Sequence, residues 1–191
     1  MSDRELDAPF CPVICRVDEL GQFRHAGFSH VVSILDPDSA VPEIFEAFER
    51  HERLDLRFHD IIDEQPDMIV PNRHHIERLL RFGRAMIASS AQVKLLVHCQ
   101  AGVSRSTAAA LLLLAAAQPG QPESAMARLR SIAPNAWPNL RVIELGDALL
   151  DLRGQLVAAV RSHYADLLAR YPAIGEVIAV DRHLRGSRDA L

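Results

Sequence analysis

The strongest constraint on the fold is a short loop that joins a buried strand to a buried helix. Residues 93–98 (VKLLVH) are apolar enough for a central parallel strand that is covered on both faces. From Ser106 onward the sequence STAAALLLLAAA favours an α-helix, because Ala and Leu have high helix propensity. Only residues 99–105 connect the two segments. A strand that passes so directly into a helix is typical of α/β domains.

The remaining segments predict a parallel sheet and several helices. β-Branched runs predict strands at 13–17 and 30–35, and alternating apolar and polar residues predict a third at 54–58. Helices are expected at 42–53, from Pro71 onward, and at 122–132, 139–152 and 155–170. The order of these elements predicts an α/β fold. It has a central, mostly parallel sheet, helices on both faces and a helical C-terminal half.

The bulk composition is that of a globular protein. Hydrophobic residues make up 49% of the 191 residues and charged residues 24%, which favours a packed domain over a disordered chain. We expect a single domain over 1–191, with a core at about 10–155 and a C-terminal helix and tail at 156–191, frayed from Ser187. The net charge of −4 gives no general reason to bind nucleic acid or an anionic membrane.

The N-terminus and the cysteines favour a cytoplasmic location. Residues 1–10 lack the apolar segment of a secretion signal, and the apolar stretch at 108–117 is too short to span a bilayer. Three cysteines, an odd number without regular spacing, do not fit a disulfide framework. We therefore expect a cytoplasmic protein, in which a reactive thiol stays reduced. The oligomeric state is left open by the sequence.

The loop at 99–105 has the features of a phosphate-binding site. Backbone N–H groups between a strand and a helix N-terminus can surround an oxyanion, and the helix dipole adds partial positive charge. Gly102 permits a backbone conformation that a side chain would disfavour. Cys99 lies in the same field, which should favour its thiolate, although a buried cysteine alone is usually inert. The candidate phosphate-binding residues are Gln100, Ala101, Gly102, Val103, Ser104 and Arg105.

Three residues beside Cys99 and its loop have further candidate roles. The planar guanidinium of Arg105 can donate two parallel hydrogen bonds to a phosphate group, which a lysine cannot do. Ser106, at the start of the predicted helix, can cap the helix or place its hydroxyl near the Cys99 sulfur. His98 precedes Cys99, and we expect it to have a structural role in which a ring nitrogen orients the loop.

The segment HCQAGVSRST at 98–107 resembles the signature of the protein tyrosine phosphatase superfamily. It is most similar to the dual-specificity branch and its compact bacterial relatives. The resemblance extends more loosely to Asp60 and to the Pro-Asn pair at 138–139, so it covers roughly residues 54–141. It implies the cysteine-phosphatase fold and phosphomonoester hydrolysis through a phosphocysteine intermediate. It implies no metal or other cofactor.

Phosphoryl transfer to a thiolate also needs an acid that protonates the leaving oxygen. The loop that contains Asp60 and Asp63 leaves the carboxyl end of a predicted strand, as Cys99 does. Such loops share one edge of a parallel sheet. Asp60 comes first and matches the position of the family's catalytic aspartate, so we prefer it, with Asp63 as the alternative. Asp36 and Asp38 share this edge, but Asp36-Pro37-Asp38 is a turn signature that explains both.

Asn139 is a supporting candidate. Similar proteins carry a Pro-Asn pair at this distance from the signature, in a segment that packs against the phosphate loop. Asn139 is equally suited to cap the helix that follows it. Asn135 is an alternative position for the same match.

The two other cysteines have no obvious chemical role. Cys11 and Cys15 lack two further ligands at metal-site spacing nearby. Some related phosphatases form a protective disulfide during oxidation, and this resemblance raises the same possibility for Cys99 with one of them.

The loop composition bears on the substrate. Gln100, Ala101, Val103 and Ser104 are all non-basic, whereas phosphoinositide-directed relatives tend to carry Lys or Arg at such positions. This favours phosphotyrosine or another phosphorylated protein residue as substrate, with a phosphoinositide or small phosphate ester as the alternative. The rival from another class is a non-catalytic phosphate-binding module. Such modules usually lose the cysteine, the arginine or the acid, and this chain has candidates for all three.

Overall fold

A four-stranded sheet forms the centre of the molecule. The computed structural model describes residues 10–89 and 92–173, so the tail predicted to fray from Ser187 lies outside the described residues. The sheet has the order β1-β4-β2-β3, and all its neighbouring strands are parallel. The strands are β1 (Val13–Arg16), β2 (His30–Leu35), β3 (Glu52–Arg57) and β4 (Leu95–Cys99). The predicted parallel sheet is therefore confirmed.

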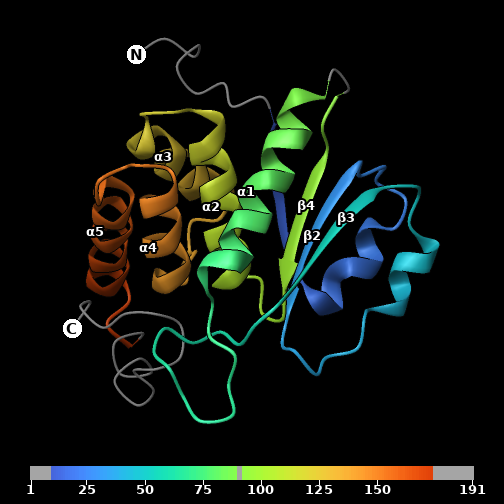
Figure 1. Ribbon diagram of the computed structural model, residues 1–191, viewed down its shortest axis with the longest axis horizontal. Helices are drawn as coiled ribbons and strands as arrows, with labels where there is room; N and C mark the ends of the chain where they lie inside the picture. Colours follow the sequence, from blue (N-terminus) through green and yellow to red (C-terminus); the bar gives the residue numbers. More distant parts are fainter. Residues whose placement is uncertain (1–9, 90–91, 174–191) are drawn as a thin grey trace.

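Helices cover both faces of this sheet, as predicted, but they differ in kind (Figure 1). The α-helices pack on one face, and two short 3-10 helices cover the other. The α-helices are α1 (Arg73–Ala88), α2 (Arg105–Ala117), α3 (Pro122–Ile132), α4 (Leu140–Leu149) and α5 (Gln155–Arg170). The 3-10 helices are η2 (Val17–Phe23) and η3 (Glu43–Ala47). The C-terminal half of the described chain is helical, as expected.

The helix predicted at 42–53 is wrong. Only η3 forms there, and the chain is extended at Phe48 and enters β3 at Glu52. The apolar spacing that suggested a helix arises because Phe45, with Ile44 and Phe48, covers the 3-10 side of the sheet from a short turn. The Glu52 N–H donates to the Ser29 carbonyl at 2.9 Å, so pairing with the sheet overrides the local helical pattern.

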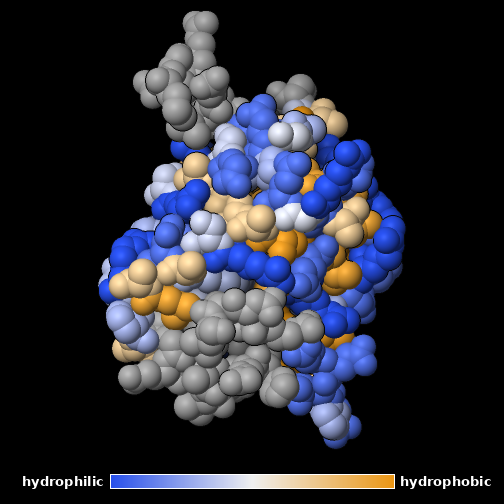
Figure 2. Space-filling model, turned by 90° about the vertical axis from the view of Figure 1, so that its left-hand side faces the viewer, coloured by the Kyte–Doolittle hydropathy of each residue, from blue (hydrophilic) through white to orange (hydrophobic). Residues whose placement is uncertain are grey.

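Helix α2 lies in the middle of the α-helical layer. Its residues are buried from Arg105 through Ala115, because it packs on the sheet and contacts α1, α3 and α4. This burial on all sides explains why its sequence is apolar throughout rather than amphipathic. Figure 2 views the molecule from the side of α5, where hydrophilic residues surround small groups of apolar ones. In the described part of the chain, no helix has both the length and the apolar composition that crossing a bilayer requires.

The sheet brings the candidate residues together at the carboxyl ends of its strands. β2 ends at Leu35, β3 at Arg57 and β4 at Cys99, and Leu35 pairs with Arg57 in register. The loops that follow these strands therefore leave from the same carboxyl edge, where α2 also begins. This confirms that Asp36, Asp60 and Cys99 share one side of the sheet.

Candidate active site

The loop after β4 folds around the Cys99 sulfur. Cys99 is 1% exposed, and the Gly102 N–H donates to its Sγ at 3.3 Å. The hydroxyl of Ser106 lies 3.2 Å from the same sulfur. Of the two roles predicted for Ser106, the structure supports the one at the sulfur, because α2 begins at Arg105 with Ser104 in the N-cap position.

Gly102 is required by two separate features of this loop. Its φ is +69°, a conformation that residues with a side chain rarely adopt. A Cβ atom there would lie 2.9 Å from the backbone nitrogen of Arg16 and 2.9 Å from the carbonyl carbon of Cys15. The loop therefore packs directly on the backbone of β1, and only glycine permits this approach.

Arg105 is buried, and one of its nitrogens is held in place. Its side chain is 3% exposed, and Nη1 donates to the Asp36 carboxylate at 2.6 Å and to the Phe58 carbonyl at 2.7 Å. Nε is also buried but has no hydrogen-bond partner in the structure. Its recorded ion-pair neighbour is Asp60 Oδ2, 3.9 Å away. A buried N–H without an acceptor costs free energy, so this donor is suited to an anionic ligand.

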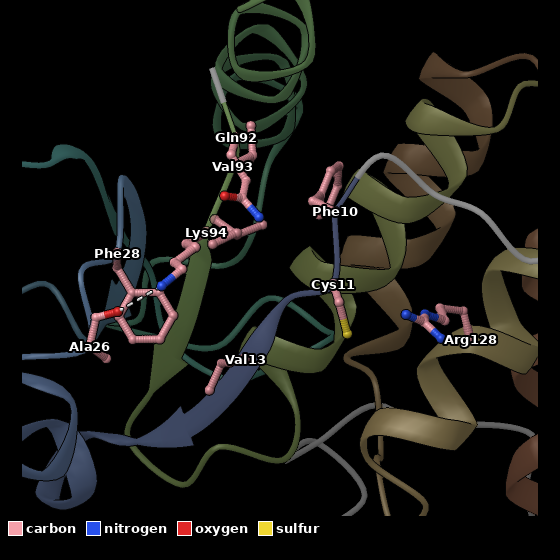
Figure 3. A pocket seen from close by; sticks show the side chains of 10 residues that line it. Phe10, Cys11, Val13, Ala26, Phe28, Gln92, Val93, Lys94 and Arg128 are labelled. Carbon is pink, nitrogen blue, oxygen red and sulfur yellow. Dashed lines mark hydrogen bonds between the residues drawn. The ribbon is translucent and has the colours of Figure 1, made fainter. Parts of the chain in front are cut away.

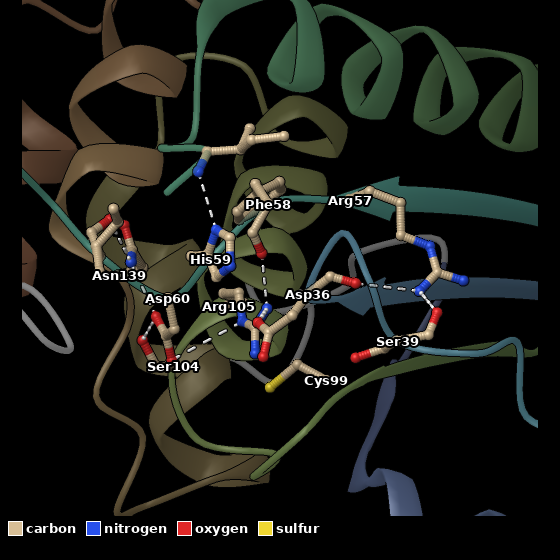
Figure 4. Close-up of polar contacts among 12 residues, drawn as sticks. Asp36, Ser39, Arg57, Phe58, His59, Asp60, Cys99, Ser104, Arg105 and Asn139 are labelled. Atoms are coloured by element: carbon tan, nitrogen blue, oxygen red, sulfur yellow. Dashed lines mark hydrogen bonds and ion pairs between the residues drawn. The ribbon is translucent and has the colours of Figure 1, made fainter. Parts of the chain in front are cut away.

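Asp36 has a role that the sequence analysis missed. It does form the predicted turn, because its carbonyl accepts from the Ser39 N–H at 3.1 Å. Its carboxylate in addition pairs with Arg105 (Figure 4). Arg57 steadies the same turn by donating to the Asp36 and Ser39 carbonyls at 3.3 and 2.8 Å. Its position directly after a predicted strand, at the edge shared with Cys99, was the one available signal.

Asp60 contacts the phosphate loop directly. Its Oδ1 accepts from the Ser104 hydroxyl at 2.7 Å and from the Asn139 amide at 2.9 Å. Asp60 is therefore fixed between the loop and the start of α4, with Oδ2 on the side of Arg105. Asp63 lies three residues further along and is partly buried. The contacts with Ser104 and Arg105 favour Asp60 of the two.

Asn139 has both of the functions considered for it. Its Oδ1 accepts from the Val142 N–H at 3.1 Å and so caps α4. Its Nδ2 donates to Asp60, and its backbone N–H donates to the Ser104 carbonyl at 3.3 Å. The alternative Asn135 is exposed. Asn139 thus ties α4 to both the phosphate loop and the candidate acid.

His98 lies on the other face of the sheet from the α-helices. Its ring is fully buried and lies 5.6 Å from the Phe45 ring. Burial lowers the pKa of His98 to about 4, and a contact with the Cys99 backbone offsets this only in part. Neither ring nitrogen has a hydrogen bond of good geometry. The ring supports the loop mainly by packing, rather than through the ring-nitrogen contact expected from the sequence.

The low pKa of His98 predicts a loss of stability in acid. Between about pH 6.5 and 4, the unfolded chain binds a proton at His98 and the folded protein does not. The free energy of unfolding should therefore fall as the pH drops through this range. Urea unfolding at several pH values should show a smaller fall for His98→Phe, which keeps a ring beside Phe45 and removes the titrating group. Equal falls in both proteins would contradict this assignment.

The positions of the other cysteines do not favour a disulfide with Cys99. Cys15 pairs with His98 and Arg16 with Cys99 in the register of β1 and β4, so the two cysteine side chains point to opposite faces. Burial, with a smaller contribution from nearby Glu19, raises the pKa of Cys15 to about 12. Cys11 precedes β1 and lines a cavity of about 500 Å³ at the amino-terminal ends of β1 and β4, away from Cys99 (Figure 3).

Within residues 10–89 and 92–173, no group of three or more His, Cys, Asp or Glu side chains is placed to hold a metal ion. No protein-family model matches the sequence. No curated protein matches it either.

Solved structures, in contrast, match at the level of the fold. The active form of Tk-PTP is 19% identical with a TM-score of 0.54, and the match covers 76% of this chain and 94% of that one. Human DUSP28 is 17% identical with a TM-score of 0.55, covering 78% and 97%. The Yvh1 phosphatase domain from Chaetomium thermophilum is 22% identical with a TM-score of 0.51, covering 78% and 95%. The chain therefore has the α/β fold of the protein tyrosine and dual-specificity phosphatases.

Proposed function

We propose that this protein hydrolyses phosphate monoesters through a phosphocysteine intermediate. The observation that carries the proposal is the buried guanidinium of Arg105. Asp36 and Phe58 hold one of its nitrogens, and its Nε has no hydrogen-bond partner, at the start of the helix that follows the Cys99 loop. A phosphate group seated over the sulfur would supply the missing acceptor, because arginine can bind two phosphate oxygens at once.

In the first step, the Cys99 thiolate attacks phosphorus. The sulfur–phosphorus bond forms as the ester oxygen–phosphorus bond breaks, and the leaving oxygen takes a proton from Asp60. The loop N–H groups and the free edge of the Arg105 guanidinium stabilise the equatorial oxygens. The hydrogen bonds from Ser104 and Asn139 occupy Asp60 Oδ1. We therefore assign the transferred proton to Oδ2.

In the second step, water attacks the phosphocysteine. The ionised Asp60 takes a proton from this water, the new oxygen–phosphorus bond forms, and the sulfur–phosphorus bond breaks. The Ser106 hydroxyl, 3.2 Å from the sulfur, can donate a hydrogen bond to the departing thiolate. The products are inorganic phosphate and the free enzyme. Arg105 and the loop supply the charge stabilisation, so the mechanism requires no metal.

The proposed substrate is a phosphotyrosine or another phosphorylated residue of a protein. Apart from Gly102, the loop residues between Cys99 and Arg105 are Gln100, Ala101, Val103 and Ser104. None of them offers a cation for a second phosphate group, which a phosphoinositide would need. A phosphorylated protein is accordingly the partner we propose.

The test is hydrolysis of p-nitrophenyl phosphate in the presence of EDTA. We expect turnover that persists with the chelator and disappears when the thiols are alkylated. Tungstate or inorganic phosphate should inhibit competitively, because they would occupy the same loop. If the protein binds tungstate but shows no turnover of any aryl phosphate, the non-catalytic binding module replaces this proposal.

Asp60→Asn should identify the acid. With phenyl phosphate, whose leaving group is poor, kcat should fall by about 10²-fold, because general acids contribute at least this much. The fall should be smaller with p-nitrophenyl phosphate, since nitrophenolate leaves without a proton. Asp63→Asn is the matched control and should stay near wild type on both substrates. The reverse ranking of the two variants would assign the acid to Asp63.

A further inference from the structure

The loop that carries Asp60 is closed by two hydrogen bonds between His59 and Ile69. The His59 backbone N–H donates to the Ile69 carbonyl at 2.8 Å. The Ile69 N–H donates in return to Nδ1 of the His59 ring at 2.9 Å. Residues 60–68 lie between these two anchors, and Asp60 is the first of them. Figure 4 shows the His59 ring and, as a dashed line, the hydrogen bond that it accepts.

The hydrogen bond from Ile69 defines the tautomer of the neutral His59 ring. Because Nδ1 accepts a hydrogen bond, it carries no proton, and the ring proton of neutral His59 lies on Nε2. The backbone half of the contact is available to any residue at this position. The side-chain half needs an acceptor located where Nδ1 is, and few side chains provide one.

A further restraint acts near the Ile69 end of the loop, where Arg141 Nε donates to the Pro71 carbonyl at 2.9 Å. The side chains of Met68 and Ile69 are 41% and 47% exposed, so they bury little apolar surface. Asp67 adopts a φ of +58°, in the left-handed region that Asp tolerates better than most residues other than glycine. Loop ends with few buried contacts open easily. The two His59 hydrogen bonds and the Arg141 contact therefore restrain this end of the loop.

We propose that His59 is a positioning residue that holds the Asp60 loop closed and so keeps the acid in place. This inference rests on the proposed function, because it assumes that Asp60 protonates the leaving group. Ser104 and Asn139 hold the Asp60 carboxylate from the side of the phosphate loop. His59 restrains the backbone from the other side, where the loop returns at Ile69. Loss of the restraint affects proton transfer, and phosphate binding by Arg105 remains.

The test compares two substitutions of His59. Asn places an amide oxygen near the position of Nδ1 and can still accept from Ile69, whereas Leu has a similar size and no acceptor. We expect His59→Leu to lower kcat on phenyl phosphate by about 10-fold, a tenth of the lower range for a general acid. The same variant should change kcat on p-nitrophenyl phosphate much less. His59→Asn should restore most of the loss on phenyl phosphate.

A second comparison separates positioning from general damage. In an Asp60→Asn background, His59→Leu should have no further effect, because the acid that it positions is already absent. Tungstate affinity should be the same in His59→Leu, His59→Asn and the wild type. Equal losses on both substrates, or a full additional loss in the Asp60→Asn background, would overturn the inference. If His59→Leu folds poorly, as judged by its thermal midpoint, His59→Gln displaces the acceptor and serves the same purpose.

The outcomes also distinguish this inference from the proposed function. A wild-type protein without phosphatase turnover contradicts the proposed function itself. A wild-type protein that is active, with His59→Leu active to the same degree on phenyl phosphate, contradicts only the role of His59.

Discussion

Cys99→Ser is expected to lose turnover by at least about 10⁴-fold, since removal of a catalytic nucleophile leaves only binding and electrostatic effects. A serine hydroxyl stays protonated at neutral pH where a thiol can ionise, and the change replaces a single sulfur atom by oxygen. Phosphate and tungstate affinity should persist, because Gly102 and Arg105 remain. The measurement is p-nitrophenyl phosphate turnover, combined with a tungstate titration of the same preparations.

The chain provides two matched controls for this variant. Cys15→Ser changes a buried thiol on the opposite face of the sheet, and Cys11→Ser changes an exposed one at the other edge. Both should retain near wild-type turnover, and only Cys15→Ser should lose some stability. Substantial residual activity in Cys99→Ser, or inactivity in either control, would refute the assignment of Cys99 as nucleophile.

Gly102→Ala is expected to lower kcat/KM by about 10²–10³-fold, since a displacement of about 1 Å in a catalytic group can cost 10²-fold. The added methyl group would meet the β1 backbone at 2.9 Å, and β1 cannot retreat because it is paired with β4. The loop must move instead, and with it the N–H groups around the sulfur. The positive φ should in addition cost about 1–2 kcal/mol of stability.

Gly120→Ala separates these two effects. Gly120 has a φ of +76°, similar to that of Gly102, but a Cβ atom there would have no neighbour within 4 Å. This variant should lose a comparable amount of stability, measured by urea unfolding, and keep its activity. If Gly102→Ala matches Gly120→Ala in both properties, the close approach to β1 has no catalytic importance.

Local sequence patterns were sufficient to predict where most of the candidate site residues lie. Cys99, Gly102 and Arg105 lie within one short loop, so the strand before them and the helix after them place all three with little help from the rest of the chain. The position of Asp60 could be predicted by similar reasoning, because the carboxyl ends of parallel strands lie at the same end of the sheet. The helices at 122–132 and 155–170 were likewise predicted with their observed bounds.

Other features could not be predicted because their cause lies in distant contacts. Asp36 looked like part of a turn, and its ion pair with Arg105 joins residues 69 positions apart. The spacing of apolar residues at 42–53 suggested a helix, but the last residues of this segment, from Glu52, pair in the sheet as the start of β3. The register of β1 with β4 separated Cys15 from Cys99, which spacing alone could not show.

By itself, the sequence determined the chemical character of the candidate site, a thiol and a guanidinium at the two ends of a glycine-containing loop, because these groups are close together in the chain, at 99–105. The tertiary structure alone decided how each group is held. Asp36 positions Arg105, Asn139 and Ser104 position Asp60, and His59 closes the loop behind it. These contacts depend on which strands become neighbours and in what register. The strand order and register are determined by burial of the whole hydrophobic core, which no local segment of the sequence shows.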